Sequence, residues 1–526
     1  MNVLTTTGPT ASHSLEPPAG PPGASLFPAA TASWVDRRLL AAGYLAGGAA
    51  VAGAALLRQT GAPAWKTMWA EDGKIFYSQA LSLPFFRTLV TPHAGYVQLF
   101  PRLVAGLASL FQPGSASLVM ALAGAASLGA LSCLVFHMAR GVVASPVLRT
   151  VLAASIVLLP VANEELLDNA VNVPWWLFFA CFWALLWRPP SRAGKVGVAL
   201  LCALAAASEP LTALLLPVVV FRWFVLRRPG DQAAGAGLVA GLVYQGAATL
   251  AGGSGGGALA TFAPGRYGAV AQAFGLRVGL ELVGGVKATN WLAGHERGLA
   301  TALGFVLVCL LVVAAVACRS RRAVVLTCVA VLGAAACFVL AAWVRGVAPI
   351  LAADKVQTGG RYQAVPLLLL VSAIVVIADS WAAGGGQHHP FAQSHSHPFL
   401  RRVRSGRGFA FWARFRRLQR RQARPEPGLT PRRALAGGEV VASGQHPYLR
   451  RREITAAAIC LVLLAPTWAA DFRDTNPRSH GPSWPAGIAQ AARRCAGAGA
   501  GTVVVHIDPQ GWKATLPCRA LVLTRS

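Results

Sequence analysis

Apolar runs of about 20 residues, separated by short arginine-rich connections, recur along most of this chain. When such a run forms a helix, its length matches the thickness of the hydrocarbon core of a bilayer. With 55% hydrophobic and only 13% charged residues, the chain has too few charges to cover a water-soluble particle of its size. We therefore expect an all-α polytopic membrane protein with about 11 transmembrane helices.

Basic residues produce the formal net charge of +28, and they gather between the apolar runs. Clusters such as Arg37-Arg38, Arg227-Arg228 and Arg321-Arg322 follow the rule that the cytoplasmic ends of spans are positive. A nucleic-acid partner would instead need these charges along one face of the protein. The pattern predicts a multi-pass protein of the plasma membrane with a cytoplasmic N-terminus, an extracytoplasmic C-terminus and no nucleic-acid partner.

Runs and clusters together divide the chain into five parts. Residues 1–33 are expected to be a disordered cytoplasmic tail, and residues 34–383 a membrane core with outer loops at 59–112, 253–296 and 344–362. A basic, disordered cytoplasmic loop (384–453), a last span (454–470) and a small α/β extracytoplasmic domain (471–526) follow. The other expected spans are 35–57, 115–138, 146–162, 173–187, a helical pair at 195–226 that turns at Ser208-Glu209-Pro210, 233–252, 297–317, 323–343 and 363–383.

Two of the ten cysteines, Cys495 and Cys518, follow the last predicted span, whereas the others lie in or beside apolar runs. Cysteines within apolar runs serve as small hydrophobic residues. Because an extracytoplasmic compartment is oxidising, we expect Cys495 and Cys518 to form a disulfide that stabilises the small C-terminal domain.

Most acidic residues of interest fall on the predicted outer side of the membrane. They are Glu71, Asp72, Glu164, Glu165, Asp168 and Glu209. A carboxylate beside hydrocarbon is costly unless it is solvated or paired, so this clustering predicts a water-filled cavity at the outer boundary. Trp175 and Trp176, in the same region, are interpreted as part of an interfacial aromatic belt, with stacking on a sugar ring as the alternative.

Three short motifs in the first outer loop carry a family resemblance. The sequences Trp69-Ala70-Glu71-Asp72-Gly73, His93-Ala94-Gly95-Tyr96 and Pro101-Arg102-Leu103 resemble the first outer loop of bacterial membrane glycosyltransferases of the GT-C superfamily. That resemblance implies a GT-C-like core with an acidic pair in the first outer loop. It also implies transfer of a sugar from a polyprenyl-phosphate carrier, with a loop carboxylate as the base.

The resemblance suggests a role for each candidate residue. Asp72 would accept the proton of the acceptor hydroxyl, and Glu71 would shift the proton affinity of the pair or position the acceptor. Arg361 and Lys355 would bind the departing phosphate beside Tyr362, although Arg361 as a plain interfacial anchor is the alternative. The remaining substrate-binding candidates are His93, Tyr96, Arg102, Glu164, Asn169 and Glu209.

No sequence motif for a metal site is present, and no cofactor is predicted. The resemblance leaves open a divalent cation shared by Asp72 and Glu164 at the acidic loop. The expected partners are a lipid-linked sugar donor, membrane lipids, and an envelope glycan or lipid acceptor.

Two other functions compete with glycosyl transfer. A transporter or flippase of lipid-linked intermediates would use the same cavity, but it would need polar groups near the middle of the bilayer. A non-catalytic scaffold for envelope assembly would use the C-terminal domain for docking. Because most polar groups lie at the predicted outer rim, the sequence favours the enzyme.

Overall fold

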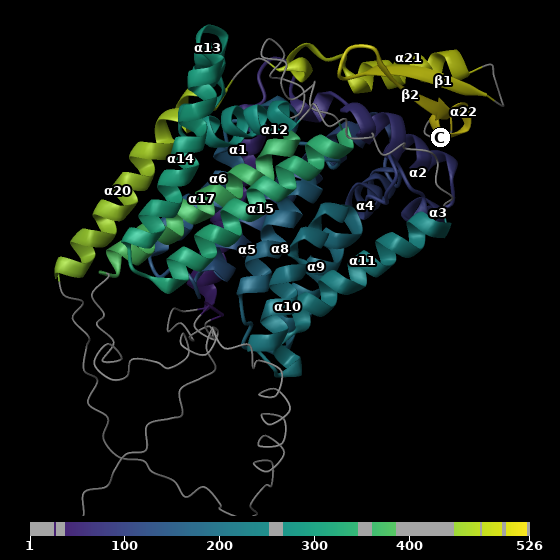
Figure 1. Ribbon diagram of the computed structural model, residues 1–526. Helices are drawn as coiled ribbons and strands as arrows, with labels where there is room; N and C mark the ends of the chain where they lie inside the picture. Colours follow the sequence, from purple (N-terminus) through teal and green to yellow (C-terminus); the bar gives the residue numbers. More distant parts are fainter. Residues whose placement is uncertain are drawn as a thin grey trace, which may run out of the picture.

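Helices make up most of the computed structural model, which describes residues 26–27, 37–251, 267–345, 360–384, 447–473, 476–496 and 501–522 (Figure 1). Within these residues, eight helices are long and apolar enough to cross a membrane. They are Arg38–Arg58, Pro113–Ala139, Ala233–Ala251, Tyr267–His295, Arg297–Ala317, Arg321–Val344, Arg361–Ala382 and Arg451–Ala470. All but Tyr267–His295 coincide with predicted spans, which confirms a multi-pass helical architecture.

The long helices pack around two central ones. In chain order they are α1 (Arg37–Arg58), α5 (Ala116–Ala139), α11 (Ala233–Ala251), α14 (Arg297–Ala317), α15 (Arg321–Arg345), α17 (Arg361–Ala382) and α20 (Pro447–Ala470). The shorter helix α8 (Val173–Leu186) is buried at every position, and α17 is buried over most of its length. Both helices are apolar all round, as expected of helices that contact protein on every side.

Four shorter helices cover the remaining predicted spans. They are α6 (Pro146–Leu158), α8, α9 (Arg192–Ser208) and a 3₁₀ helix η5 (Pro210–Leu215) that continues as α10 (Leu216–Val225). The predicted turn at residues 208–210 is confirmed, because α9 ends at Ser208 and a Glu209 carboxylate oxygen accepts a hydrogen bond from the Leu211 amide. The total of about 11 spans stays a prediction.

The predicted outer loop at 253–296 is helical where it is described. It contains α12 (Tyr267–Phe274), a π-helical turn η8 (Gly275–Leu280) and α13 (Glu281–His295). Arg277 and Glu281 lower the hydropathy of this segment, but they form a buried ion pair with an N–O distance of 2.8 Å. Because pairing offsets much of the cost of burying the two charges, the segment packs against α14 as a helix.

Arginine-rich connections meet at one end of the bundle, which we call the arginine end. There, Arg188 forms an ion pair with Asp231, and Arg222 donates hydrogen bonds to the Leu185 and Trp187 carbonyl oxygens. Helices α1 and α20 begin at this end, opposite the strands and α21 (Figure 1). The concentration of positive charge is the arrangement that the positive-inside rule predicts for a cytoplasmic face.

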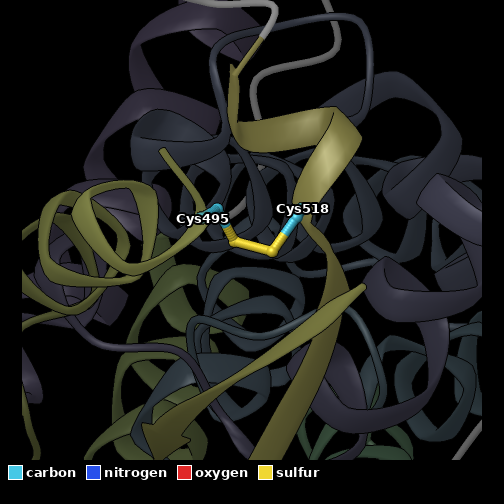
Figure 2. The surroundings of a disulfide bond; sticks show 2 residues. All are labelled: Cys495 and Cys518. Carbon is cyan, nitrogen blue, oxygen red and sulfur yellow. A yellow bond between two sulfur atoms is a disulfide. The ribbon is translucent and has the colours of Figure 1, made fainter. Parts of the chain in front are cut away.

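The C-terminal segment lies at the opposite end, which we call the sheet end (Figure 1). It contains η11 (Pro477–His480), α21 (Trp484–Cys495), the antiparallel pair β1 (Thr502–Ile507) and β2 (Trp512–Pro517), and α22 (Cys518–Val522). A disulfide joins Cys495 at the end of α21 to Cys518 at the start of α22, as predicted (Figure 2).

This segment shares a hydrophobic core with the first loop after α1. That loop contains η2 (Ala64–Lys66), η3 (Asp72–Tyr77), α2 (Ser78–Ser82), α3 (Phe85–Val90), α4 (Leu99–Ala108) and η4 (Pro113–Ser115). Phe76 and Tyr77 of the loop belong to the same buried cluster as Trp484 and Ile507. The predicted boundary at residue 471 coincides with the end of α20, and the segment after it packs against the first loop.

Two further boundaries differ from the predictions. Phe27, inside the predicted disordered tail, is 1% exposed and packs its ring 6.0 Å from that of Phe221. Helix α20 begins at Pro447, inside the predicted basic loop, because Arg450-Arg451-Arg452 extend the helix instead of ending it. Most of the predicted tail and of the 384–453 loop lies outside the described residues.

Candidate functional site

A cavity of about 170 Å³ with both polar and apolar lining opens at the sheet end, between the first loop and the ends of α8, α15 and α17. We call it the Arg361 cavity. Its lining includes Glu71, His93, Tyr96, Gln98, Asn172, Trp175, Ser208, Glu209, Leu340, Arg361 and Tyr362. These residues come from segments far apart in the sequence, so the cavity exists only in the folded chain.

Arg361 is the cationic centre of this cavity, at the first position of α17. Its Nη1 lies 3.6 Å from the Glu71 Oε1, and its Nε lies 3.7 Å from the Glu165 Oε1. The Arg361 and Glu71 side chains keep 26% and 15% of their surface exposed, so both are accessible to a ligand. A guanidinium held between two carboxylates keeps its fork of donors oriented, which suits binding of a phosphate group.

Two aromatic rings form a wall of the Arg361 cavity. Trp175 and Tyr362 meet edge to face, with ring centroids 5.7 Å apart, and the Arg361 guanidinium lies 5.3 Å from the centroid of the Tyr362 ring. Trp175 lines this cavity, which fits the alternative that it stacks on a sugar ring. Such a surface can stack on the apolar face of a sugar or hold an isoprenoid unit.

Asp72, the predicted base, lies beside the cavity and not in its lining. Its side chain is 1% exposed, and its two carboxylate oxygens accept hydrogen bonds from the Ala170 and Val171 amides, both at 2.9 Å. Burial raises the pKa of Asp72 to about 7, although these two hydrogen bonds and nearby Arg478 act in the opposite direction. Asp72 therefore fixes the 165–172 loop, and Glu71 is the member of the acidic pair that faces the cavity.

The other predicted site residues divide into three groups. His93, Tyr96 and Glu209 line the cavity together with Arg361 and Tyr362. Arg102 and Asn169 do not: Arg102 donates a hydrogen bond to Gln79, and Asn169 donates to the Glu165 and Leu167 carbonyl oxygens. Lys355 and the Glu164 side chain lie outside the described residues.

The prediction did not assign Glu165, which pairs with Arg361, or Trp175, which lines the cavity, to the site. Both flank the loop that carries Asp168 and Asn169, and that loop was already predicted to face outward. The spacing of Glu165 and Arg361 in the chain gives no sign that their side chains meet. Only the packing of α17 against α7 (Ala162–Glu165) brings them together.

An apolar groove of about 460 Å³ continues along the helices that line the Arg361 cavity. On α8 the groove is lined by Phe178 and Phe182, one turn beyond Trp175. On α15 it is lined by Val329, Gly333 and Ala336, one turn before Leu340. The same face of α15 therefore lines both the groove and the Arg361 cavity. Leu332, also in the lining, is 69% exposed, which places this part of the groove at the surface of the bundle.

Among the described residues, no group of three or more His, Cys, Asp or Glu side chains is arranged to hold a metal ion. The Glu71 and Glu165 carboxylates are instead oriented toward Arg361. The divalent cation that the family resemblance leaves open depends partly on Glu164, whose side chain is not described.

Comparisons with protein-family models, with curated proteins and with solved structures find no match to this chain. The functional interpretation therefore depends on the chemistry of the cavity itself. A carboxylate, a guanidinium and an aromatic wall meet in one cavity, and an apolar groove begins about one helical turn away on α8 and α15. This combination suits a substrate with a polar, anionic head and a long apolar tail.

Proposed function

We propose that the chain is a membrane glycosyltransferase that moves a sugar from a polyprenyl-phosphate donor to an envelope acceptor at the outer face of the plasma membrane. The observation that carries this proposal is that neighbouring turns of α8 and α15 line both the Arg361 cavity and the apolar groove. A lipid-linked donor has its phosphate at the interface and its tail in hydrocarbon, so it needs both environments side by side.

In the proposed reaction, the oxygen of an acceptor hydroxyl attacks the anomeric carbon of the donor sugar. Glu71 accepts the hydroxyl proton as the new glycosidic bond forms, which requires a base within hydrogen-bond reach. The bond between the anomeric carbon and the phosphate oxygen breaks, and the polyprenyl phosphate leaves with the electron pair. Arg361 turns from its carboxylate partners to the leaving phosphate and stabilises its negative charge.

Glu71→Gln is the substitution that tests this role. It keeps the size and hydrogen-bonding shape of the side chain but removes the base, so we expect sugar transfer to fall by about 10² to 10⁴-fold. The purified protein would be reconstituted in vesicles with synthetic polyprenyl-phosphate sugars, and release of polyprenyl phosphate would be measured together with sugar in the acceptor.

Protein yield and thermal unfolding serve as controls, because Glu71 is partly exposed and its replacement should not affect folding. Gln98→Ala is a further control, because it changes another residue of the cavity lining without removing a carboxylate. Full transfer by the Glu71→Gln protein would rule out Glu71 as the base.

Transport of a lipid-linked intermediate is the second candidate, because one ion pair is buried within a candidate span. Arg277 and Glu281 are 3% and 0% exposed in Tyr267–His295, where a transporter would place charged groups. Neither residue lines the Arg361 cavity or the apolar groove. Movement of the donor across the vesicle membrane without sugar transfer would favour this candidate.

A further inference from the structure

We infer that Arg478, in the C-terminal segment, is a positioning residue that holds the acidic motif so that Glu71 faces the Arg361 cavity. Its catalytic meaning depends on the proposed function, whereas its effect on the motif can be measured without it. Arg478 lies in η11 and is 5% exposed, and no part of its side chain lines the cavity.

Arg478 connects two segments on either side of the acidic motif. Its Nε donates to the Thr67 hydroxyl at 2.7 Å, and its Nη2 donates to the Ala64 and Thr67 carbonyl oxygens at 2.8 and 3.1 Å. Its Nη1 donates to the Asp168 carbonyl oxygen at 2.9 Å. One guanidinium therefore fixes the residues just before the Trp69–Gly73 motif and the loop that packs against it.

Asp508, the residue just after β1, holds the first part of the motif through backbone hydrogen bonds. The Asp508 amide donates to the Met68 carbonyl oxygen at 3.0 Å, and the Ala70 amide donates to the Asp508 carbonyl oxygen at 2.5 Å. This bridge holds Ala70 with a φ of +22°, a backbone conformation that alanine rarely adopts. Because Ala70 precedes Glu71, the conformation enforced there decides the direction in which the Glu71 side chain leaves the backbone.

On the other side of Glu71, Asp72 is fixed by the Ala170 and Val171 amides. Glu71 thus lies between two neighbours whose positions are set by the C-terminal segment and by the 165–172 loop. Arg478 belongs to the C-terminal segment, and its side chain contacts the backbone just before the motif at Thr67 and the 165–172 loop at Asp168. Loss of its hydrogen bonds should free the motif and the loop together.

Geometry, rather than charge alone, explains why arginine occupies this position. The hydrogen bonds of Arg478 described above all end on uncharged oxygen atoms, and all three guanidinium nitrogens donate. A lysine ammonium would restore the charge but could not span the same set of acceptors. A positioning role therefore predicts that Arg478→Lys fails to rescue the protein.

The experiment compares Arg478→Lys and Arg478→Ala with Arg494→Ala, which removes an exposed arginine from the end of α21 in the same segment. Amide hydrogen exchange would be measured for the motif, the 165–172 loop and β1. Donor turnover would be measured in the same preparations. We expect both Arg478 variants to exchange faster at Ala70 and Val171 while β1 stays protected, and the donor kcat to fall by about 100-fold with little change in KM.

Unchanged exchange at Ala70 and Val171 in both Arg478 variants would overturn the inference, as would full rescue by lysine. If Arg478→Ala also loses protection in β1, that variant has lost structure beyond the motif and the loop. Exchange at Ala70 and Val171 in the Arg478→Lys protein then tests the inference. Failure of the Glu71→Gln test would instead remove the proposed function, and the exchange data would still show whether Arg478 positions the motif.

Discussion

Glu71 and Asp72 are adjacent in the chain, yet their carboxylates end in different surroundings. Successive residues of a helical turn point about 100° apart, so only one of the two can face the cavity. Glu71 faces Arg361, whereas Asp72 is enclosed by backbone amides. Separate substitutions at these two positions should therefore affect different properties of the protein.

Substitution of Asp72 should change how stability depends on pH. Burial raises the pKa of this carboxyl to about 7, whereas the same carboxyl in an unfolded chain titrates near 3.9. The folded protein then binds the proton more tightly than the unfolded chain. The resulting contribution to the free energy of unfolding is fully present below about pH 4 and is lost as the pH rises through about 7.

Because Asn does not titrate, Asp72→Asn should flatten this dependence. We expect the midpoint of thermal unfolding in detergent to fall less between about pH 5 and about pH 8 than in the wild type, by on the order of 1–2 °C. An identical change with pH in the two proteins would show that Asp72 does not titrate in this range.

The sequence pointed to the acidic pair and favoured Asp72 as the base, whereas Glu71 is the member of the pair that lines the cavity. The order of Glu71 and Asp72 in the chain does not say which side chain turns inward, because that depends on the unusual backbone at Ala70. The contribution of Arg478 was also hidden, since its partners at Ala64 and Thr67 lie about 400 residues earlier.

At the scale of elements, hydropathy identified the long helices well because a bilayer imposes one length on all of them. The Tyr267–His295 segment was missed because a charged pair lowers its hydropathy without preventing its burial. The apolar groove was missed as well. The groove forms where faces of α8, α10 and α15 do not pack against one another. Which faces remain unpacked depends on the tertiary structure and not on hydropathy.

Helix α15 provides a test of the groove. Ala336→Phe places a ring in the groove lining, so we expect the KM for a long-chain donor to rise by about tenfold, equivalent to about 1.4 kcal/mol. The KM for a short-chain donor should change little. Val339→Phe is the matched control, because Val339 is 40% exposed and lines neither the groove nor the Arg361 cavity.

Equal KM changes for long-chain and short-chain donors, or equal effects of the two phenylalanine variants, would contradict a role of the groove in holding the lipid tail. The comparison uses one helix and one introduced side chain. General effects on membrane insertion should therefore be alike in both proteins.

For the whole molecule, the bundle has two chemically different ends. The arginine end carries the connections with Arg188, Arg222 and their neighbours, and the sheet end carries the Arg361 cavity and the disulfide. A disulfide and a lipid-linked sugar acceptor site both belong outside the cytoplasm under the proposed function. Every functional role given to Glu71 therefore requires the sheet end to face outward.

Labelling of single introduced cysteines with a membrane-impermeant maleimide tests this requirement most directly. Lys66→Cys lies beside the acidic motif at the sheet end, Arg228→Cys lies at the arginine end, and both native side chains are exposed. The unsubstituted chain provides the background from its native thiols. We predict that the cysteine at position 66 is labelled in intact cells and the one at position 228 only after permeabilisation; the reverse pattern would place Glu71 in the cytoplasm and contradict the account.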